Sequence, residues 1–223
     1  MALMSTEPIS GGVWFFVVKG GPVMIPIILL SIAALTIILA KWWELWRFRA
    51  RFNKLTMRLY GLVQDGNLSG ALQASREDAT SLGRVFESVI VHRGQERADL
   101  TRRLERLGGD VVADLESYMG ALATIIGVEP MLGFLGTIVG LIKAFMNWET
   151  MGDRITINLL AGGIYEAMIT TAGGLIVAIP YYLIYNHLVT KVGQLTRLTE
   201  ERTEEFVDLV TDMNIRGPIR HAL

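Results

Sequence analysis

The stretch that decides the fold class is PVMIPIILLSIAALTIILA, residues Pro22–Ala40. It contains no charged residue, and a helix of about 20 apolar residues, at roughly 1.5 Å per residue, crosses the ~30 Å hydrocarbon core of a bilayer. Pro22 and Pro26 fall in the first turns of this helix, where proline is tolerated. The stretch therefore predicts a transmembrane helix, which we place at residues 22–43.

Two further apolar runs follow it. Residues 120–148 contain Glu129 and Lys143 as their only charged groups, and residues 161–188 contain a single carboxylate, Glu166. Each run is long enough to cross a bilayer as a helix. We therefore predict an all-α integral membrane protein with three transmembrane helices.

The basic residues predict the orientation of these helices. They gather after the first run, as Lys41, Arg47, Arg49, Arg51, Lys54 and Arg58. The connection 149–160 has only Arg154, and the segment before Gly20 has only Lys19. Because Lys and Arg favour the cytoplasmic side of a membrane, we expect the N-terminus outside and the C-terminus inside.

This orientation divides the chain into seven segments. They are a periplasmic interfacial segment (1–21), the first transmembrane helix (22–43), a cytoplasmic helical domain (44–119), the second transmembrane helix (120–148), a short periplasmic loop (149–160), the third transmembrane helix (161–188) and a cytoplasmic C-terminal helix and tail (189–223).

Two apolar stripes with helical spacing lie outside the spans. The first comprises Leu100, Leu104, Leu107, Val111, Leu115 and Tyr118, and the second Leu188, Val192, Leu195, Thr199, Arg202, Phe206, Leu209 and Met213. The first stripe predicts one long helix that continues into the second span, with Gly108-Gly109 as the candidate bend. The second stripe predicts that the third span continues as an amphipathic helix. This helix packs either within one subunit or also against its own copies in a ring.

Composition excludes several other classes of protein. The chain has 223 residues, of which 51% are hydrophobic, with a net charge of -1 and no cysteine. A disordered chain has lower hydrophobicity and higher net charge, and a nucleic-acid binder shows a basic excess. Without cysteine there is no disulfide framework or thiolate zinc site. Because no catalytic or metal-binding motif is present either, we expect no enzyme activity, catalytic residue, metal or cofactor.

Small residues and hydroxyls mark one face of the second and third spans. Gly133, Gly136, Gly140 and Gly174 are expected to let the helix backbones pack closely. Thr137 and Thr171 lie in the middle of their spans on the same faces. Since the short connection makes the two spans antiparallel, the two threonines are expected to share a depth.

The charges inside the spans allow two interpretations. Lys143 and Glu166 both lie toward the outer end, where they either pair with each other or line a vestibule that contacts a partner. Glu129 lies on the inner half of the second span, either near the interface or facing a watery lumen.

Three motifs resemble the ExbB/TolQ branch of the MotA/TolQ/ExbB ion-channel family. The run KGGPVMIP from Lys19 resembles the family's approach to its first span. The run PMLGFLGTIVGLI from Pro130 is similar to the signature P-x-L-G-L-L-G-T-V-x-G. The run GIYEAMITTAGGLIVAIP from Gly163, with Tyr185-Asn186 beyond it, resembles the signature G-I-x-E-A-L-x-x-T-A-x-G-L-x-x-A-I-P…Y-N.

The resemblance implies an inner-membrane subunit of a motor driven by the proton motive force. Such subunits form a homopentamer, within the membrane lipids, around two copies of a single-span ExbD/TolR-like partner whose membrane aspartate binds the ion. A TonB- or TolA-like protein then passes the work across the periplasm for import, Tol-type envelope maintenance or gliding. On this chain the family's ion-path threonines are Thr137 and Thr171, and its third-span glutamate is Glu166.

Two positions depart from the family pattern. Glu129 precedes Pro130 where small or apolar residues are common, and Thr170 precedes Thr171 where alanine is common. We count Thr170 with the ion pathway, because an extra oxygen suits sodium, a hard cation. Proton is the default ion and sodium stays open.

The residues themselves add one constraint on the carrier. Threonine does not titrate, so a proton path at this depth needs a carboxylate from another chain. The second choice is that Glu166 or Glu129 titrates. The rival hypothesis is a membrane ring that holds a partner and conducts nothing.

Overall fold

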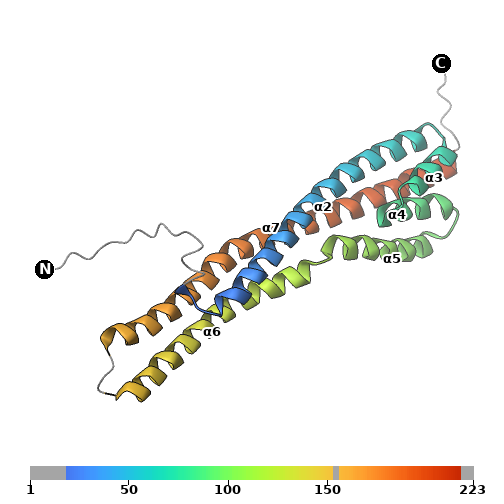
Figure 1. Ribbon diagram of the computed structural model, residues 1–223. Coiled ribbons are helices and arrows are strands. Elements are labelled where there is room, and N and C mark those ends of the chain that lie inside the picture. The colour runs from blue at the N-terminus through green and yellow to red at the C-terminus, as the bar shows by residue number, and fades with distance from the viewer. Residues whose placement is uncertain (1–18, 153–155, 217–223) are drawn as a thin grey trace. The chain divides into compact units, whose positions relative to one another are not determined.

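The structure, a computed structural model, describes residues 19–152 and 156–216. Within these residues it contains helices and no strand (Figure 1). The helices are α2 (Met24–Gln64), α3 (Leu68–Glu77), α4 (Ser81–Val91), α5 (Arg97–Glu116), α6 (Met119–Met151) and α7 (Ile157–Arg216). Three stretches are long and apolar enough to cross a membrane: α2, α5–α6 and α7. The predicted all-α class with three spans is confirmed.

The predicted segments are only partly covered. Most of the N-terminal interfacial segment, residues 1–18, lies outside the described residues, as do residues 153–155 of the predicted loop and 217–223 of the tail. The described chain forms two compact units. The first unit consists of residues 19–39 and 118–186, and the second unit of residues 40–117 and 187–216.

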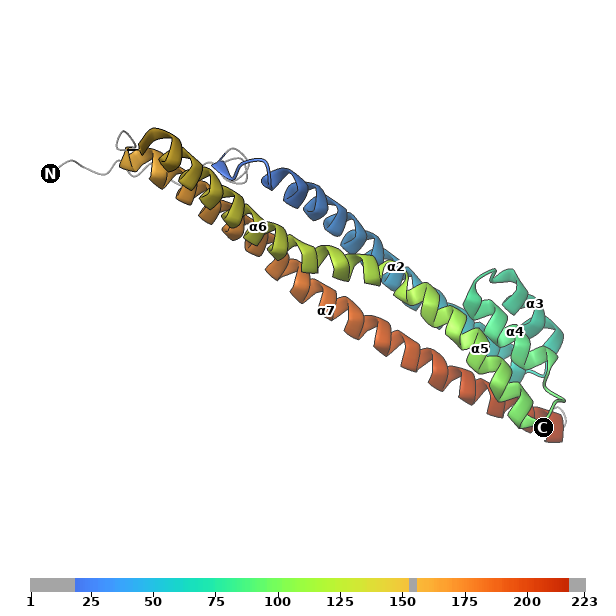
Figure 2. The same cartoon turned by 90° about the horizontal axis from the view of Figure 1, so that it is seen from below.

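In the first unit, α6 and the beginning of α7 run side by side and antiparallel (Figure 2). The buried residues of α6 recur every three or four positions: Met119, Leu122, Ile126, Glu129, Gly133, Gly136, Gly140 and Ala144. This spacing puts all of them on one face of the helix. The start of α2 also packs on α7, where the Ser31 and Tyr181 hydroxyls are 3.2 Å apart.

In the second unit, α3 and α4 pack beside α2 and the end of α7 (Figure 1). The apolar core comprises Phe52, Leu55, Leu59, Val63, Ala71, Ala74, Leu82, Phe86, Val89, Ile90, Leu100, Phe206, Val207 and Val210. At its centre the rings of Phe86 and Phe206 meet edge to face at 5.1 Å. The Asn67 side chain caps α3 by accepting from the Gly70 N–H at 2.8 Å.

The structure corrects two details of the predicted stripes. On α7 the buried position is Thr203 rather than Arg202, whose side chain is 46% exposed. The stripe therefore takes an extra step of four, from Thr199 to Thr203, because a strict seven-residue repeat drifts around an α-helix. Tyr118 is 71% exposed rather than part of the first stripe.

The expected bend at Gly108-Gly109 is wrong, because α5 runs through it without interruption. The chain breaks instead at Ser117–Tyr118, where Tyr118 has a left-handed backbone with φ of 61°. Nothing in the side chain of a tyrosine favours that conformation. The sequence therefore carried no signal for this break.

Lys41 holds the end of α5 at that break. Its side chain is 1% exposed, and its ammonium donates to the carbonyls of Asp114 and Leu115 at 3.5 and 3.2 Å. It also donates to the Ser117 hydroxyl at 3.0 Å and to the Glu44 carboxylate at 2.9 Å. The last carbonyls of a helix lack partners within it and carry partial negative charge, so a buried cation there is a C-terminal cap.

We expect Lys41→Met to destabilise the second unit by about 2–4 kcal/mol, because buried carbonyls then lose their donor. The measurement is thermal unfolding of the purified protein in mild detergent. Lys54→Met is the matched control, since Lys54 is exposed on the same helix. An unchanged midpoint for Lys41→Met would show that water caps α5 equally well.

Candidate functional site

The first unit brings α6 and α7 into backbone contact through their glycines. A methyl group built at Gly174 would lie 2.9 Å from the Glu129 carbonyl oxygen and 3.1 Å from the Gly133 Cα. A methyl at Gly140 would lie 2.7 Å from the Ala167 Cβ, and one at Gly136 would overlap Thr170. Glycine is therefore required at these positions for the helices to approach so closely.

This close approach joins the two mid-span threonines. Thr171 donates its hydroxyl proton across the contact to the Gly133 carbonyl at 2.8 Å. Thr137 donates to the Phe134 carbonyl of its own helix at 2.6 Å. The two hydroxyl oxygens are 3.1 Å apart, so Thr137 and Thr171 do share a depth.

The two hydroxyls can exchange hydrogen-bond partners. Each carries one proton and two acceptor sites, so either hydroxyl can turn its proton from a carbonyl toward the other oxygen. The arrangement is thus a short hydrogen-bond chain between two helices, half-buried at both threonines. Because neither hydroxyl titrates, the pair can relay a proton but cannot store charge.

Thr170 points elsewhere. Its side chain is 1% exposed, and its hydroxyl contacts the carbonyl of Gly20 at 2.6 Å and that of Glu166 at 2.9 Å. Adjacent helical residues face different directions. Thr170 therefore ties the segment before α2 to α7, and its hydroxyl does not join the Thr137–Thr171 pair.

Lys143 and Glu166 form an ion pair between α6 and α7. The Lys143 ammonium lies 2.8 Å from the Glu166 carboxylate, with 44% and 28% of the side chains exposed. The Glu166 carboxylate also packs against Gly21, which has φ of +67° and no room for a Cβ. Of the two sequence interpretations, the structure shows the pair.

We expect reversal of either charge to destabilise the α6–α7 contact. Lys143→Glu or Glu166→Lys alone places like charges side by side, whereas the double reversal restores the pair. The expected coupling energy is about 1–3 kcal/mol. Thermal unfolding of the four proteins in detergent measures this cycle, and strictly additive effects would argue against the pair.

Glu129 occupies an unexpected environment. The side chain is 0% exposed, so within the subunit it does not face a watery lumen, and the alternative position near the interface stays a prediction. The position lies on the buried face of α6, where α7 covers it at Gly174. Neither carboxylate oxygen has a hydrogen-bond partner among the described residues.

Sequence reasoning missed the contribution of the segment before α2. The carbonyl of Gly20 binds Thr170, and Gly21 leaves room for Glu166. The sequence signal was the run KGGPVMIP from Lys19, which we interpreted only as resembling the family's approach to its first span. Only the structure shows that this turn lies against α7.

Comparisons with known proteins show the family of this chain. Residues 74–201, which include α6 and most of α7, match the MotA/TolQ/ExbB proton channel family. The chain belongs to this family. The matched residues include the runs from Pro130 and from Gly163, which contain the glycines and the threonine pair.

Individual relatives lie in the same branch. An ExbB-like protein of Synechocystis sp. is 30% identical over 178 residues, which are 79% of this chain and 70% of that protein. The biopolymer transport protein ExbB of Salmonella typhimurium is 30% identical over 185 residues, 77% of this chain and 73% of that protein. The Tol-Pal system protein TolQ of Haemophilus influenzae is 34% identical over 99 residues, 44% of this chain and 43% of that protein.

Proposed function

We propose that this chain is the channel subunit of an ion-driven motor in the bacterial inner membrane, and that the Thr137–Thr171 pair lines its ion path. The observation that carries the proposal is the 3.1 Å contact between the two hydroxyls at the glycine-lined junction of α6 and α7. A scaffold needs the glycines for packing, but it has no need of two hydroxyls facing each other.

The titrating group comes from a partner under this proposal. The described pair offers hydroxyls only, so the first choice for the group that gains and loses the proton beside it is a carboxylate from another chain, and a carboxylate of this chain is the second choice. An ExbD/TolR-like single-span protein with a membrane aspartate has the required chemistry. Five copies of the chain would surround two copies of this partner, and a TonB- or TolA-like protein would carry the work to import, Tol-type envelope maintenance or gliding.

Proton is favoured over sodium as the transported ion. Sodium would need several oxygen ligands at one point, as hard cations do. The hydroxyl of Thr170, which suggested that possibility, contacts the backbone carbonyls of Gly20 and Glu166 instead. The pair at Thr137 and Thr171 is better suited to relaying protons along hydrogen bonds.

The test is Thr171→Val in the complex assembled with its single-span partner. Valine keeps the shape of threonine and removes the donor to Gly133, so we expect ion-driven activity to fall at least about tenfold, the effect of roughly 1.4 kcal/mol on a barrier. The measurement is proton uptake into vesicles at a set membrane potential, repeated with sodium in place of protons.

Thr124→Val is the matched control. Within the described part of the chain, the Thr124 hydroxyl donates only to the Gly120 carbonyl of its own helix, at 2.9 Å, and its side chain is exposed. We expect this variant to keep its activity. Normal uptake in both Thr171→Val and Thr137→Val would exclude the ion path and favour a non-conducting ring.

A further inference from the structure

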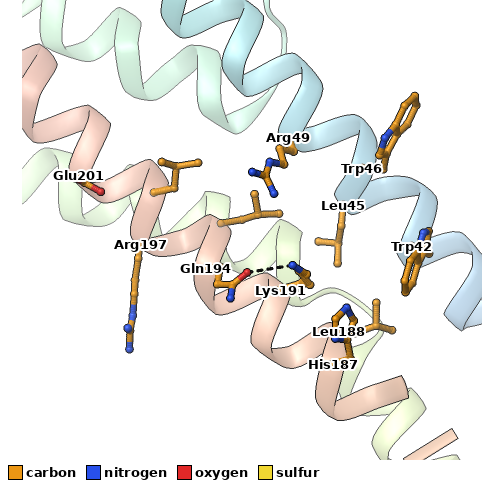
Figure 3. Close-up of a pocket in the computed structure, with 12 residues that line it drawn as sticks. Trp42, Leu45, Trp46, Arg49, His187, Leu188, Lys191, Gln194, Arg197 and Glu201 are labelled. Atoms are coloured by element: carbon orange, nitrogen blue, oxygen red, sulfur yellow. Dashed lines mark hydrogen bonds between the residues drawn. The ribbon is translucent and has the colours of Figure 1, made fainter. Parts of the chain in front are cut away.

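The second unit contains a cavity of about 490 Å³ between α2 and α7 (Figure 3). Its apolar wall includes Leu45 of α2 and Leu188 and Leu195 of α7, all three buried. Trp42 and Trp46 stand at its rim on α2, 56% and 64% exposed. A volume of this size matches small-ligand sites, which typically measure about 300–1,000 Å³.

Two cations approach this cavity from opposite helices. In Figure 3, Arg49 of α2 and Lys191 of α7 extend into the space between the helices, whereas Arg197 extends away from α2. Lys191 contacts the Gln194 side-chain oxygen at 3.4 Å. Among the described residues, no carboxylate lies within ion-pair distance of either Arg49 or Lys191.

Some other cations of the same unit do form ion pairs. Arg58 pairs with Glu77 at 2.9 Å, and Arg76 pairs with Glu87 at 2.7 Å. The single acid in the lining of the cavity is Glu201. The cavity therefore has an excess of positive charge that the described protein does not neutralise.

The cavity also begins where two apolar runs end. Trp42 comes two residues after the uncharged stretch that closes at Ala40, and His187 is the last residue but one of the third apolar run. The rings of Trp42 and His187 stack at 5.9 Å, which joins the two helix segments at this level. Tryptophan and basic residues at the end of a span are typical of the membrane–water interface.

We propose that this cavity binds an acidic phospholipid of the adjacent leaflet. The lipid phosphate lies between Arg49 and Lys191, and the glycerol and upper acyl chains lie against the leucine wall and the tryptophan rim. Basic pockets between membrane helices bind acidic headgroups in this way. A free phosphate would satisfy the cations but would leave the apolar wall without a partner. This inference does not depend on ion conduction.

The test places the full-length protein in nanodiscs made from equal parts of phosphatidylglycerol and phosphatidylcholine. Native mass spectrometry then counts the lipids that stay bound. We expect phosphatidylglycerol to be retained about tenfold or more over phosphatidylcholine, because each basic residue near a headgroup contributes severalfold to acidic-lipid binding. The double variant Arg49→Gln/Lys191→Gln should retain both lipids equally.

Two further variants separate a built site from general attraction. Arg51→Gln/Lys54→Gln removes two exposed charges from α2 outside the cavity and should keep the preference. Gln194→Trp keeps every charge but fills the cavity, so it should lose the bound lipid.

Four results would overturn the proposal. The first is equal retention of the two lipids by the wild type, and the second is an undiminished preference for phosphatidylglycerol in Arg49→Gln/Lys191→Gln. The third is an equal loss of that preference in the control variant Arg51→Gln/Lys54→Gln, and the fourth is retention of the lipid by Gln194→Trp. Displacement of the lipid by inorganic phosphate alone would assign the site to a soluble anion. A wild type that retains no lipid, together with capture of a second copy by a photo-cross-linking residue placed at position 46, would assign the cavity to a subunit interface.

Discussion

Gly174→Leu should abolish both the folded subunit and its ion-driven activity. The three atoms nearest to a Cβ built at Gly174 are all backbone: the Glu129 carbonyl oxygen at 2.9 Å, then the Gly133 Cα and N at 3.1 and 3.4 Å. Backbone cannot turn aside as a side chain can, so α6 and α7 must separate. Overpacking typically lowers the free energy of unfolding by about 1–3 kcal/mol. We expect the loss for a leucine pressed against a helix backbone to lie at or above the upper end of that range.

Separation of the helices also acts on the threonine pair. The donor bond from Thr171 ends on the carbonyl of Gly133, the residue that Gly174 touches. The same displacement therefore breaks the cross-helix bond and the 3.1 Å hydroxyl contact. The measurements are the monodisperse yield in detergent, the thermal midpoint and proton uptake, all of which we expect to fall together.

Gly162→Leu on the same helix is the control. A Cβ at Gly162 meets no atom within 4 Å, so this leucine adds the same bulk without a clash inside the subunit. We expect near-normal yield and thermal midpoint. A Gly174→Leu protein as stable as this control would show that the α6–α7 contact is looser than the structure has it.

The fold followed from the sequence wherever hydrophobic pattern decides it. Predominantly apolar runs of about 20 residues or more cross a bilayer as helices, so the three spans were predictable. The pairing of α6 and α7 followed from their short connection and from small residues at helical spacing. That pairing in turn predicts that Thr137 lies opposite Thr171, as the structure has them.

The rest depended on contacts between distant residues. The cap that Lys41 forms on α5 joins positions more than 70 residues apart, and no local sequence pattern predicts it. The break at Tyr118 has no glycine or proline to mark it. Thr170 and Thr171 were both counted with the ion pathway, but one turns toward Gly20 before α2 and the other toward Gly133 of α6, and only these contacts separate their roles.

Glu129 is the clearest example of a residue whose surroundings the sequence does not predict. Its burial leads to the second large prediction. A charge inside a span suggested water nearby, whereas the structure buries both carboxylate oxygens without a partner among the described residues. Burial of an unpartnered polar group opposes folding. Natural proteins keep such a group mainly where function requires it. We therefore assign Glu129 to the ion-driven step, as a proposal that one substitution tests.

Glu129→Met should stabilise the isolated subunit and inactivate the motor. Methionine has similar length and flexibility and needs no hydrogen-bond partner, so we expect a gain of about 1–3 kcal/mol in the free energy of unfolding. Proton uptake by the complex should fall at least about tenfold. Glu129→Gln, which keeps the polar shape but cannot titrate, should lose uptake without that gain in stability.

Opposite changes in stability and uptake separate this proposal from a structural role. If Glu129 only supports the fold, Glu129→Met lowers the thermal midpoint, and uptake falls only because less folded protein is present. If the carboxylate of Glu129 has no role in ion transfer, the Glu129→Met protein is more stable than the wild type and fully active. Glu149→Gln, which changes an exposed acid on the same helix, should leave both quantities unaltered. Only a more stable and inactive Glu129→Met protein fits a carboxylate kept for ion transfer at the expense of stability.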